Sequence, residues 1–376
     1  MSKLIPITIF SIVMAMLSHR FSEYDYINYK YVRRERFFYT IMSIAMILFV
    51  GLRTYFNDTY LYMAIYEKTP KDIGLMDGID WSKLGENPGY FFMNRVIKRL
   101  GFTVHGYLIF HAIISVGIPL WFIRKYSSDI TLSIWIFICF AGYLFTLAAL
   151  KQCVAMALCM LATHYVIQKK YIPFILWVLV AMTYHPYALL YFATPFLMFR
   201  PWGGKTFAML VLAVCVGFSL KTIMGTLISM TDMLGEHYDK ESFTGEGINP
   251  MRLVVTSVPV VLSLVVSRQI SEKDDTPHYL IVNLSMLNAE LMFVALFGDP
   301  NYFGRLANYF LPFQALSIPW LLTHFTPNSK RVMTILTAVG FGGYLFYSQV
   351  IHESFDDCYR GISLWKYFEI LLTGGK

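Results

Sequence analysis

The chain has 376 residues, of which 56% are apolar and only 15% are charged. Because a soluble domain typically carries about 25% charged residues, this composition excludes an ordinary soluble protein. The net charge is +7, but the basic residues lie between long apolar runs without an aromatic-interleaved groove, which excludes a nucleic-acid-binding protein. The five cysteines have neither disulfide nor zinc-site spacing.

Apolar runs recur along nearly the whole chain. A helix needs about 20 apolar residues to cross a bilayer core, so we expect an all-α integral membrane protein with about twelve transmembrane helices (11 to 14). These form a single polytopic domain, residues 1–376. No small-residue cleavage site follows the first run, so we expect it to be retained as a span. The runs lie near residues 4–18, 37–55, 104–123, 129–147, 149–167, 171–184, 187–199, 206–225, 251–267, 279–297, 304–323 and 332–349.

Two long apolar stretches must contain a break. The stretch 129–167 is too long for one span, and its first polar pair begins at Lys151, so a turn is expected there. The stretch 171–199 is also too long. We expect it to break at His185 and Pro186, because proline removes a backbone donor and disfavours helical geometry in the preceding residue.

Basic residues orient the predicted spans. The loop after the first run contains Arg20, Lys30, Arg33, Arg34 and Arg36. By the positive-inside rule this loop faces the cytoplasm and the N-terminus faces out. Alternation then places three features on the outer face: the segment 56–103 with an amphipathic helix, the loop 226–249, and a short C-terminal helix at the membrane interface.

Seven polar residues from distant segments map to this outer face. Such groups at membrane depth are costly and usually face a cavity or a partner, so their convergence indicates a site that opens to the extracytoplasmic side. The alternative is that the ends of spans simply tolerate charge. The seven residues are Arg53, Asp58, Lys151, Gln152, His185, Asp299 and Arg305.

The segment after the second run combines a cation, an acid and tyrosines. Asp58, Tyr62 and Tyr66 are spaced by four, so they would lie on one face of a helix that begins near Asp58. Asp58 could act in a site or only cap that helix. Arg53 could bind an anion or only extend to the membrane interface.

Arg305 follows the turn sequence GDPNYFG and precedes the apolar run RLANYFLPFQALSIPWLL. A cation at the start of a helix is opposed by the helix dipole. Its presence there favours an anion shared between the guanidinium and the free helical amides. The alternative is a guanidinium among lipid headgroups or paired with Asp299.

Four further residues are candidates for binding or proton transfer. The reference pKa of histidine is near neutral, which suits proton transfer from a hydroxyl, although His185 could also be only an interface residue. Lys151 and Gln152 could also lie at the interface without a further role. Glu86 precedes a run whose apolar spacing indicates an amphipathic helix on the outer surface.

Five motifs occur in an order that resembles a known family. They are GLRTYFNDTYLY (51–62), ENPGY (86–90), LKQCVAMAL (150–158), LVAMTYHPYALL (179–190) and FGRLANYF (303–310). Together they resemble the EpsG-type branch of the Wzy-like polysaccharide polymerases, over roughly residues 37–325. The family commonly has Arg-Gln where this chain has Lys151 and Gln152, which puts a bidentate phosphate contact in doubt but keeps a point charge.

The resemblance implies a multi-span glycosyltransferase in the bacterial inner (cytoplasmic) membrane. It implies polymerisation of O-antigen for lipopolysaccharide, of capsule or of exopolysaccharide. The implied substrates are oligosaccharides linked to polyprenyl pyrophosphate, such as undecaprenyl pyrophosphate, with the active site facing the periplasm or exterior. No metal or other cofactor is implied. Membrane lipids and a chain-length regulator are the implied partners, without nucleic acid.

The implied chemistry gives each candidate residue a role. The leaving diphosphate needs cations to stabilise its negative charge, and the acceptor hydroxyl needs a base, for which Asp58 and His185 are both open. The implied catalytic residues are Asp58, His185, Arg305 and Arg53, and the implied substrate-binding residues are Lys151, Gln152, Tyr62, Tyr309 and Glu86.

Two other classes of protein remain open. A flippase or transporter of the same lipid-linked sugar would use the cations to bind pyrophosphate, and a membrane O-acyltransferase would use a histidine. The long outer segment 56–103 and the lack of basic residues at midspan disfavour a carrier. Three separated cations exceed what an acyltransferase needs.

Overall fold

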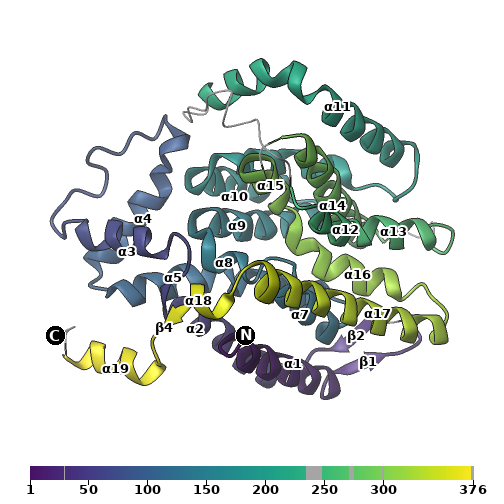
Figure 1. Cartoon of the computed structure of the whole chain (residues 1–376), viewed down its shortest axis with the longest axis horizontal. Coiled ribbons are helices and arrows are strands. Elements are labelled where there is room, and N and C mark those ends of the chain that lie inside the picture. The colour runs from purple at the N-terminus through teal and green to yellow at the C-terminus, as the bar shows by residue number, and fades with distance from the viewer. Residues whose placement is uncertain (29, 234–247, 271–274, 299, 374–376) are drawn as a thin grey trace.

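The computed structural model describes residues 1–28, 30–233, 248–270, 275–298 and 300–373. These residues are mainly helical, with two short two-stranded antiparallel sheets. Figure 1 shows the helices gathered side by side, with α9 in the interior and α11 along one edge.

The first part of the chain, up to the break at His185, contains α1 Leu4–Arg20, β1 Glu23–Asp25, β2 Lys30–Arg33, α2 Phe37–Gly51, β3 Arg53–Tyr55, α3 Thr59–Lys68, η1 Leu84–Glu86, α4 Pro88–Arg99, α5 Val104–Ser115, α6 Gly117–Tyr126, α7 Ile130–Cys139, α8 Phe145–Ala148, α9 Leu150–Ile167 and α10 Tyr171–Tyr184. Here η denotes a short 3₁₀-helix, except η6, which is a π-helix.

The second part contains η2 Pro186–Leu197, α11 Gly204–Met233, α12 Pro250–Thr256, α13 Val258–Val265, α14 Thr276–Val294, η4 Ala295–Phe297, α15 Pro300–Asn308, η5 Leu311–Phe313, α16 Gln314–Leu322, α17 Pro327–Phe346, η6 Tyr347–His352, α18 Phe355–Cys358, β4 Arg360–Gly361 and α19 Leu364–Thr373.

Four helical stretches in the described residues are long and apolar enough to cross a membrane. Seven shorter apolar helices accompany them, so the chain is an all-α, multi-pass membrane protein. The number of spans, expected to be about twelve, stays a prediction. The long stretches are Val104–Tyr126, Leu150–Ile167, Thr276–Phe297 and Pro327–His352.

The helix α9 forms the centre of the core. It packs against α10, α5, α6 and η2, and nearly all of its side chains are buried. Small buried residues such as Ala155, Cys159 and Ala162 let neighbouring helices approach closely, which is how helices associate in membranes. The stretch Pro327–His352, by contrast, exposes most of its surface, as expected for a helix that faces lipid.

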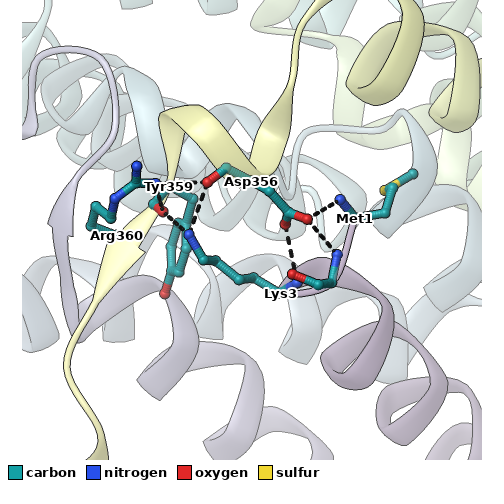
Figure 2. Close-up of polar contacts among 6 residues, drawn as sticks. Met1, Lys3, Asp356, Tyr359 and Arg360 are labelled. Atoms are coloured by element: carbon teal, nitrogen blue, oxygen red, sulfur yellow. Dashed lines mark hydrogen bonds and ion pairs between the residues drawn. The ribbon is translucent and has the colours of Figure 1, made fainter.

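One end of the bundle joins residues far apart in the sequence. The Nζ of Lys3 donates to the carbonyl oxygens of Asp356 and Tyr359, each at 2.8 Å, as Figure 2 shows. The Tyr359 hydroxyl donates to the carbonyl of Phe49 at 2.9 Å. Beside these contacts β3 pairs with β4, so the end of α2 and the C-terminal segment are joined at this end.

The opposite end of the helices joins the loops that carry the basic residues. Arg34 Nη2 donates to the carbonyl of Ser127 at 2.9 Å, and the Tyr24 hydroxyl donates to that of Ser128 at 2.8 Å. Segments expected to share one face of the membrane therefore do lie together. Which face is cytoplasmic stays a prediction.

Both predicted breaks are present, and each has a local cause. The helix α10 ends at Tyr184, and His185 adopts an extended backbone before Pro186 begins η2. The stretch 129–167 breaks between α7 and α9, where Gly142 takes a φ of +112°, a conformation that favours glycine. Lys151 therefore lies in the first turn of α9 rather than at the break itself.

The outer segment 56–103 contains α3 and α4. Lys98, on α4, donates to the carbonyls of Tyr66 and Glu67, which closes the C-terminal end of α3. Arg99 donates to the carbonyl of Ile73 in the connecting loop. The helix α4 buries Tyr90 and its neighbours on one face, whereas α19 exposes its apolar side chains. Of the loop 226–249, residues 234–247 lie outside the described residues.

Candidate active site

A small cavity lies where the ends of several helices meet. It has a volume of about 130 Å³ and is formed by the start of α3, the start of α4, the first turn of α9, the junction of α10 with η2, and α15. Six of the nine predicted site residues line it. The lining residues are Asp58, Tyr62, Asn87, Ala149, Lys151, Gln152, His185, Tyr187, Tyr302 and Arg305.

Gln152 connects two walls of this cavity. Its side chain is only 3% exposed, and its Nε2 donates to the backbone carbonyl of Arg305 at 2.7 Å. Its Oε1 is buried and has no hydrogen-bond partner in the described part of the chain. One of its two N–H groups is used by the protein and Oε1 is left over, so Gln152 can accept a hydrogen bond from a hydroxyl.

Lys151 precedes Gln152 in the first turn of α9 and lines the same cavity. Its ammonium lies 5.7 Å from the centre of the Tyr90 ring, within the range of a cation–π contact. Tyr90 belongs to α4, so the contact joins the outer segment to the core. The structure thus places a positive charge at the cavity wall.

His185 forms a hydrogen bond with Tyr309, which lies outside the cavity. The Tyr309 hydroxyl lies 2.8 Å from His185 Nδ1, and Tyr309 itself is fully buried and does not line the cavity. Burial, with smaller effects of the nearby cations Lys151 and Arg305, lowers the pKa of His185 to about 3. The imidazole is therefore neutral at physiological pH.

Asp58 lies at the N-terminal boundary of α3, but its carboxylate makes no capping hydrogen bond. Its side chain is exposed and lines the cavity. Tyr62 follows one helical turn later, is 6% exposed and lines the cavity too. Tyr66, the third member of the predicted face, instead stacks on Tyr107 away from the site.

Arg53 lies behind Asp58 and not in the cavity. It is 1% exposed, and it donates from Nε to Thr59 Oγ1 at 2.9 Å and from Nη1 to the Val50 carbonyl at 2.7 Å. Burial lowers the pKa of Arg53 to about 10, so the guanidinium is still charged at neutral pH. These bonds connect the end of α2 to the first turn of α3 and so fix the position of Asp58.

Arg305 lies in the last turn of α15, so the prediction that it opens a helix is wrong. The apolar run after it does not form one helix, because Pro312 interrupts it within η5. The dipole of α15 therefore favours the cation instead of opposing it. The Arg305 side chain is exposed and makes no hydrogen bond or ion pair with the described residues.

Glu86 does not line the cavity. Its carboxylate lies 3.3 Å from Lys83 Nζ in an exposed ion pair. Its neighbour Asn87 takes its place at the cavity wall. Asp299, which was expected to be near Arg305, lies outside the described residues.

A larger groove adjoins the cavity and shares Asp58, Ala149 and Arg305 with it. Its volume is about 850 Å³. Apolar residues of α7 and α8 form part of its wall, together with Tyr344 of α17 and Tyr347 of η6. The groove therefore has an apolar wall beside a polar end that leads to the cavity.

Arg252 is a second cation in this groove. It is on α12, and its Nη2 donates to Asn308 Oδ1 at 2.6 Å. A Cβ atom built on Gly304 would lie 3.9 Å from Arg252 Nη1, so Arg252 packs against the residue that precedes Arg305. Sequence reasoning missed Arg252, because a cation at the start of an apolar run looks like an interface anchor.

Comparison with protein families matches residues 36–367, nearly the whole chain, to the EpsG family. The chain belongs to the EpsG family. This is a family of Wzy-like polysaccharide polymerases, so the family indicates a polysaccharide polymerase of the glycosyltransferase type. No curated protein and no solved structure matches the chain.

In this EpsG-family chain the structure explains why the ENPGY motif contains asparagine, proline and glycine at positions 87 to 89. Asn87 has a φ of +56°, a conformation that asparagine tolerates better than most residues, and it lines the cavity. Pro88 begins α4. A Cβ atom on Gly89 would lie 2.0 Å from Thr183 Oγ1, so only glycine lets α4 approach the end of α10 this closely. The motif therefore brings Asn87 to the site.

Proposed function

We propose that this chain joins oligosaccharide repeat units linked to polyprenyl pyrophosphate, on the extracytoplasmic face of the bacterial inner membrane and without a metal ion. The polymer would be an O-antigen or an exopolysaccharide. The observation that carries the proposal is one cavity in which Asp58, Gln152, His185 and Arg305 meet from four distant segments. Asp58 supplies an acid, Gln152 and His185 supply neutral hydrogen-bonding groups, and Arg305 supplies a cation that has no partner among the described residues. These are the groups that glycosyl transfer from a diphosphate needs.

Each of these groups has a proposed role in the bond changes of the reaction. The acceptor hydroxyl oxygen attacks the anomeric carbon of the donor, and its proton goes to the Asp58 carboxylate. The bond from that carbon to the diphosphate oxygen breaks, and its electron pair leaves with the carrier diphosphate. Arg305 and Lys151 stabilise the charge that develops on this leaving group.

Asp58 is the better base of the two that the sequence left open. Its carboxylate is exposed to both the cavity and the groove. His185, whose pKa is lowered to about 3, has little affinity for a proton at neutral pH. We assign His185 the tautomer in which the Tyr309 hydroxyl donates to Nδ1 and Nε2 carries the proton. In this tautomer His185 acts as a hydrogen-bond donor to the substrate.

The groove is the proposed site of the donor's carrier lipid. Its apolar wall suits an isoprenoid chain, and Arg252 and Arg305 lie at its polar end. The acceptor hydroxyl then approaches from the smaller cavity, where Gln152 Oε1 can accept a hydrogen bond. Arg53 is assigned a positioning role, because its bonds to Val50 and Thr59 keep it behind the site.

A flippase or transporter of lipid-linked sugars and a membrane O-acyltransferase are the alternatives. A flippase has no use for an exposed carboxylate beside the bound diphosphate, since the two negative charges repel each other. An acyltransferase histidine must act as a base, whereas His185 has a strongly lowered pKa. The cavity therefore favours glycosyl transfer.

The test follows the lipid-linked repeat unit in cells that lack this chain. A polymerase defect leaves single repeat units on the outer leaflet of the inner membrane, and Arg305→Ala should reproduce this defect with normal protein levels. Arg99→Ala is the matched control, since Arg99 is on α4 and lines neither cavity nor groove. Accumulation of the unit on the inner leaflet would identify a flippase, and polymer lacking only acyl groups would identify an acyltransferase.

The sidedness of the site has its own test. Lys71 is exposed in the outer segment, and Asn328 is exposed at the start of α17 near the opposite end. A cysteine at position 71 should react with a membrane-impermeant thiol reagent in intact cells, relative to the unsubstituted chain. A cysteine at position 328 should react only after permeabilisation. The reverse pattern would place the site in the cytoplasm.

A further inference from the structure

A second pocket lies at the end of the bundle opposite the candidate active site. It has a volume of about 760 Å³, and we refer to it as the basic pocket. It lies between the end of α1, the start of α2 and the end of α6. Its lining contains four arginines, Arg33, Arg34, Arg36 and Arg124, but only one acid, Glu35.

Glu35 offsets only one of these four positive charges, and its carboxylate bonds to the backbone instead of pairing with an arginine. Its Oε1 accepts hydrogen bonds from the amides of Phe37 and Phe38, and its Oε2 accepts one from Phe38 at 3.1 Å. These bonds cap the first turn of α2. The pocket therefore keeps an excess of positive charge without a carboxylate that pairs with Arg34 or Arg124 among the described residues.

The two less exposed arginines, Arg34 and Arg124, are held by hydrogen bonds, but one donor of Arg34 is unused. Arg124 donates to the carbonyls of Arg34 and Glu35 at 3.2 to 3.3 Å. Arg34 Nη2 donates to the Ser127 carbonyl, whereas Arg34 Nη1 is buried without a hydrogen-bond partner among the described residues. Burial lowers the pKa of Arg34 to about 10, so the group stays charged at neutral pH.

The rim of the basic pocket is apolar. Phe21, Val32 and Phe37 line it, and each exposes more than 60% of its surface. Because α1 ends and α2 begins here, this rim lies at the level where membrane-spanning helices reach the lipid headgroups. A pocket with a positively charged interior and an apolar rim suits a ligand in which a phosphate is joined to acyl chains.

We propose that the basic pocket binds the headgroup phosphate of an anionic phospholipid, whose acyl chains lie against Phe21 and Phe37. A positively charged pocket between helix ends is the kind of site that anionic headgroups occupy. The site is separate from the proposed polymerase reaction, since it lies at the other end of the bundle. It gives the protein a structural lipid that joins the loop before α2 to α6.

The test uses the purified full-length protein in detergent and two charge-matched double variants. Arg33→Gln with Arg36→Gln removes two exposed arginines of the pocket, whereas Arg268→Gln with Arg331→Gln removes two exposed arginines elsewhere. Binding of dioleoylphosphatidylglycerol is measured by native mass spectrometry, with dioleoylphosphatidylcholine as the neutral lipid. The first variant should bind the anionic lipid roughly thirtyfold more weakly at low salt.

The control variant should bind the anionic lipid as the unsubstituted protein does. Equal losses in the two double variants would overturn the proposal, because the binding would then depend on overall charge. Equal binding of the neutral lipid would overturn it too. Displacement of the lipid by inorganic phosphate at matched concentration would assign the pocket to a soluble anion instead. Unchanged elution volumes and thermal unfolding temperatures show that both variants are folded.

Discussion

The side chain of Gln152 donates a 2.7 Å hydrogen bond to the backbone carbonyl of Arg305. This bond joins the first turn of α9 to the last turn of α15, two segments 153 residues apart in the sequence. Gln152 contributes the acceptor Oε1 and Arg305 contributes the guanidinium, and neither group has a partner in the part of the chain that the structure describes. The relative position of the proposed acceptor and leaving-group sites therefore depends on this bond.

Gln152→Leu should lose most of the polymerising activity. The substitution leaves the Arg305 carbonyl without its donor and removes Oε1 from the cavity, and loss of alignment of this kind reduces rates by about a hundredfold. The unpaired carbonyl should cost about 1 to 3 kcal/mol of stability. Initial rates with purified protein measure the effect. Gln168→Leu, at the other end of α9, is the matched control and should keep activity. Equal activity of the two variants would show that Gln152 has no role in the reaction.

Asp58→Asn and His185→Gln should affect activity differently. Asp58→Asn keeps the shape but removes the base, so polymer should be lost with the protein present at normal levels, at a cost of about 10² to 10⁴ in rate. His185→Gln keeps a hydrogen-bond donor and should retain part of the activity. Polymer length and initial rate are the measurements. If Asp58→Asn polymerises normally while His185→Gln does not, the two roles are exchanged.

The buried neutral state of His185 predicts a pH dependence of stability. The pKa of His185 in the fold is about 3, below its ordinary value of 6.5, so its contribution to the free energy of unfolding is present above pH 6.5 and is lost as pH falls toward 3. Between pH 7 and pH 5 the loss should be about 2 kcal/mol. Thermal unfolding of the detergent-solubilised protein should therefore shift more steeply with pH in the unsubstituted chain than in His185→Gln. Parallel shifts would show that His185 is not buried as a neutral group.

Gly89→Ala should destabilise the contact between α4 and α10. The added methyl group would lie 2.0 Å from Thr183 Oγ1 and 2.7 Å from its Cβ, so one of the helices must move, at a cost of about 1 to 3 kcal/mol. Asn87 would move with α4, and activity should fall. Gly343→Ala is the control, since nothing lies within 4 Å of that position. If Gly89→Ala and Gly343→Ala had the same thermal stability, the close approach of α4 to α10 would be contradicted.

The sequence predicted much of this arrangement, because membrane depth restricts polar residues so strongly. Asp58, Lys151, Gln152, His185 and Arg305 were found as outer-face groups, and the structure brings them to one cavity. The break at His185 followed from Pro186 alone. These features depend on local sequence and on hydrophobic periodicity, which a single chain displays directly.

Other features depended on tertiary contacts that the sequence does not display. Arg53 was expected to contact the substrate, but its Nε and Nη1 donate to Thr59 and Val50, and its buried Nη2 has no partner among the described residues. Arg305 was expected to begin a helix, because the residues before it were expected to form a turn, whereas α15 already begins at Pro300. Arg252 reaches the groove only because α12 packs beside α15. The errors at Arg53 and Arg252 concern which neighbour a side chain meets, and hydrophobic pattern carries no such information.

The most direct test is a turnover measurement with the purified protein and one lipid-linked repeat unit. The account predicts one molecule of polyprenyl pyrophosphate released for each glycosidic bond formed, at the same rate with and without a chelator. Arg305→Ala should be about a hundredfold slower, a loss of about 3 kcal/mol in transition-state stabilisation, and Arg305→Lys should be intermediate. Normal turnover by Arg305→Ala, or activity that stops with chelator and returns with magnesium, would contradict the account.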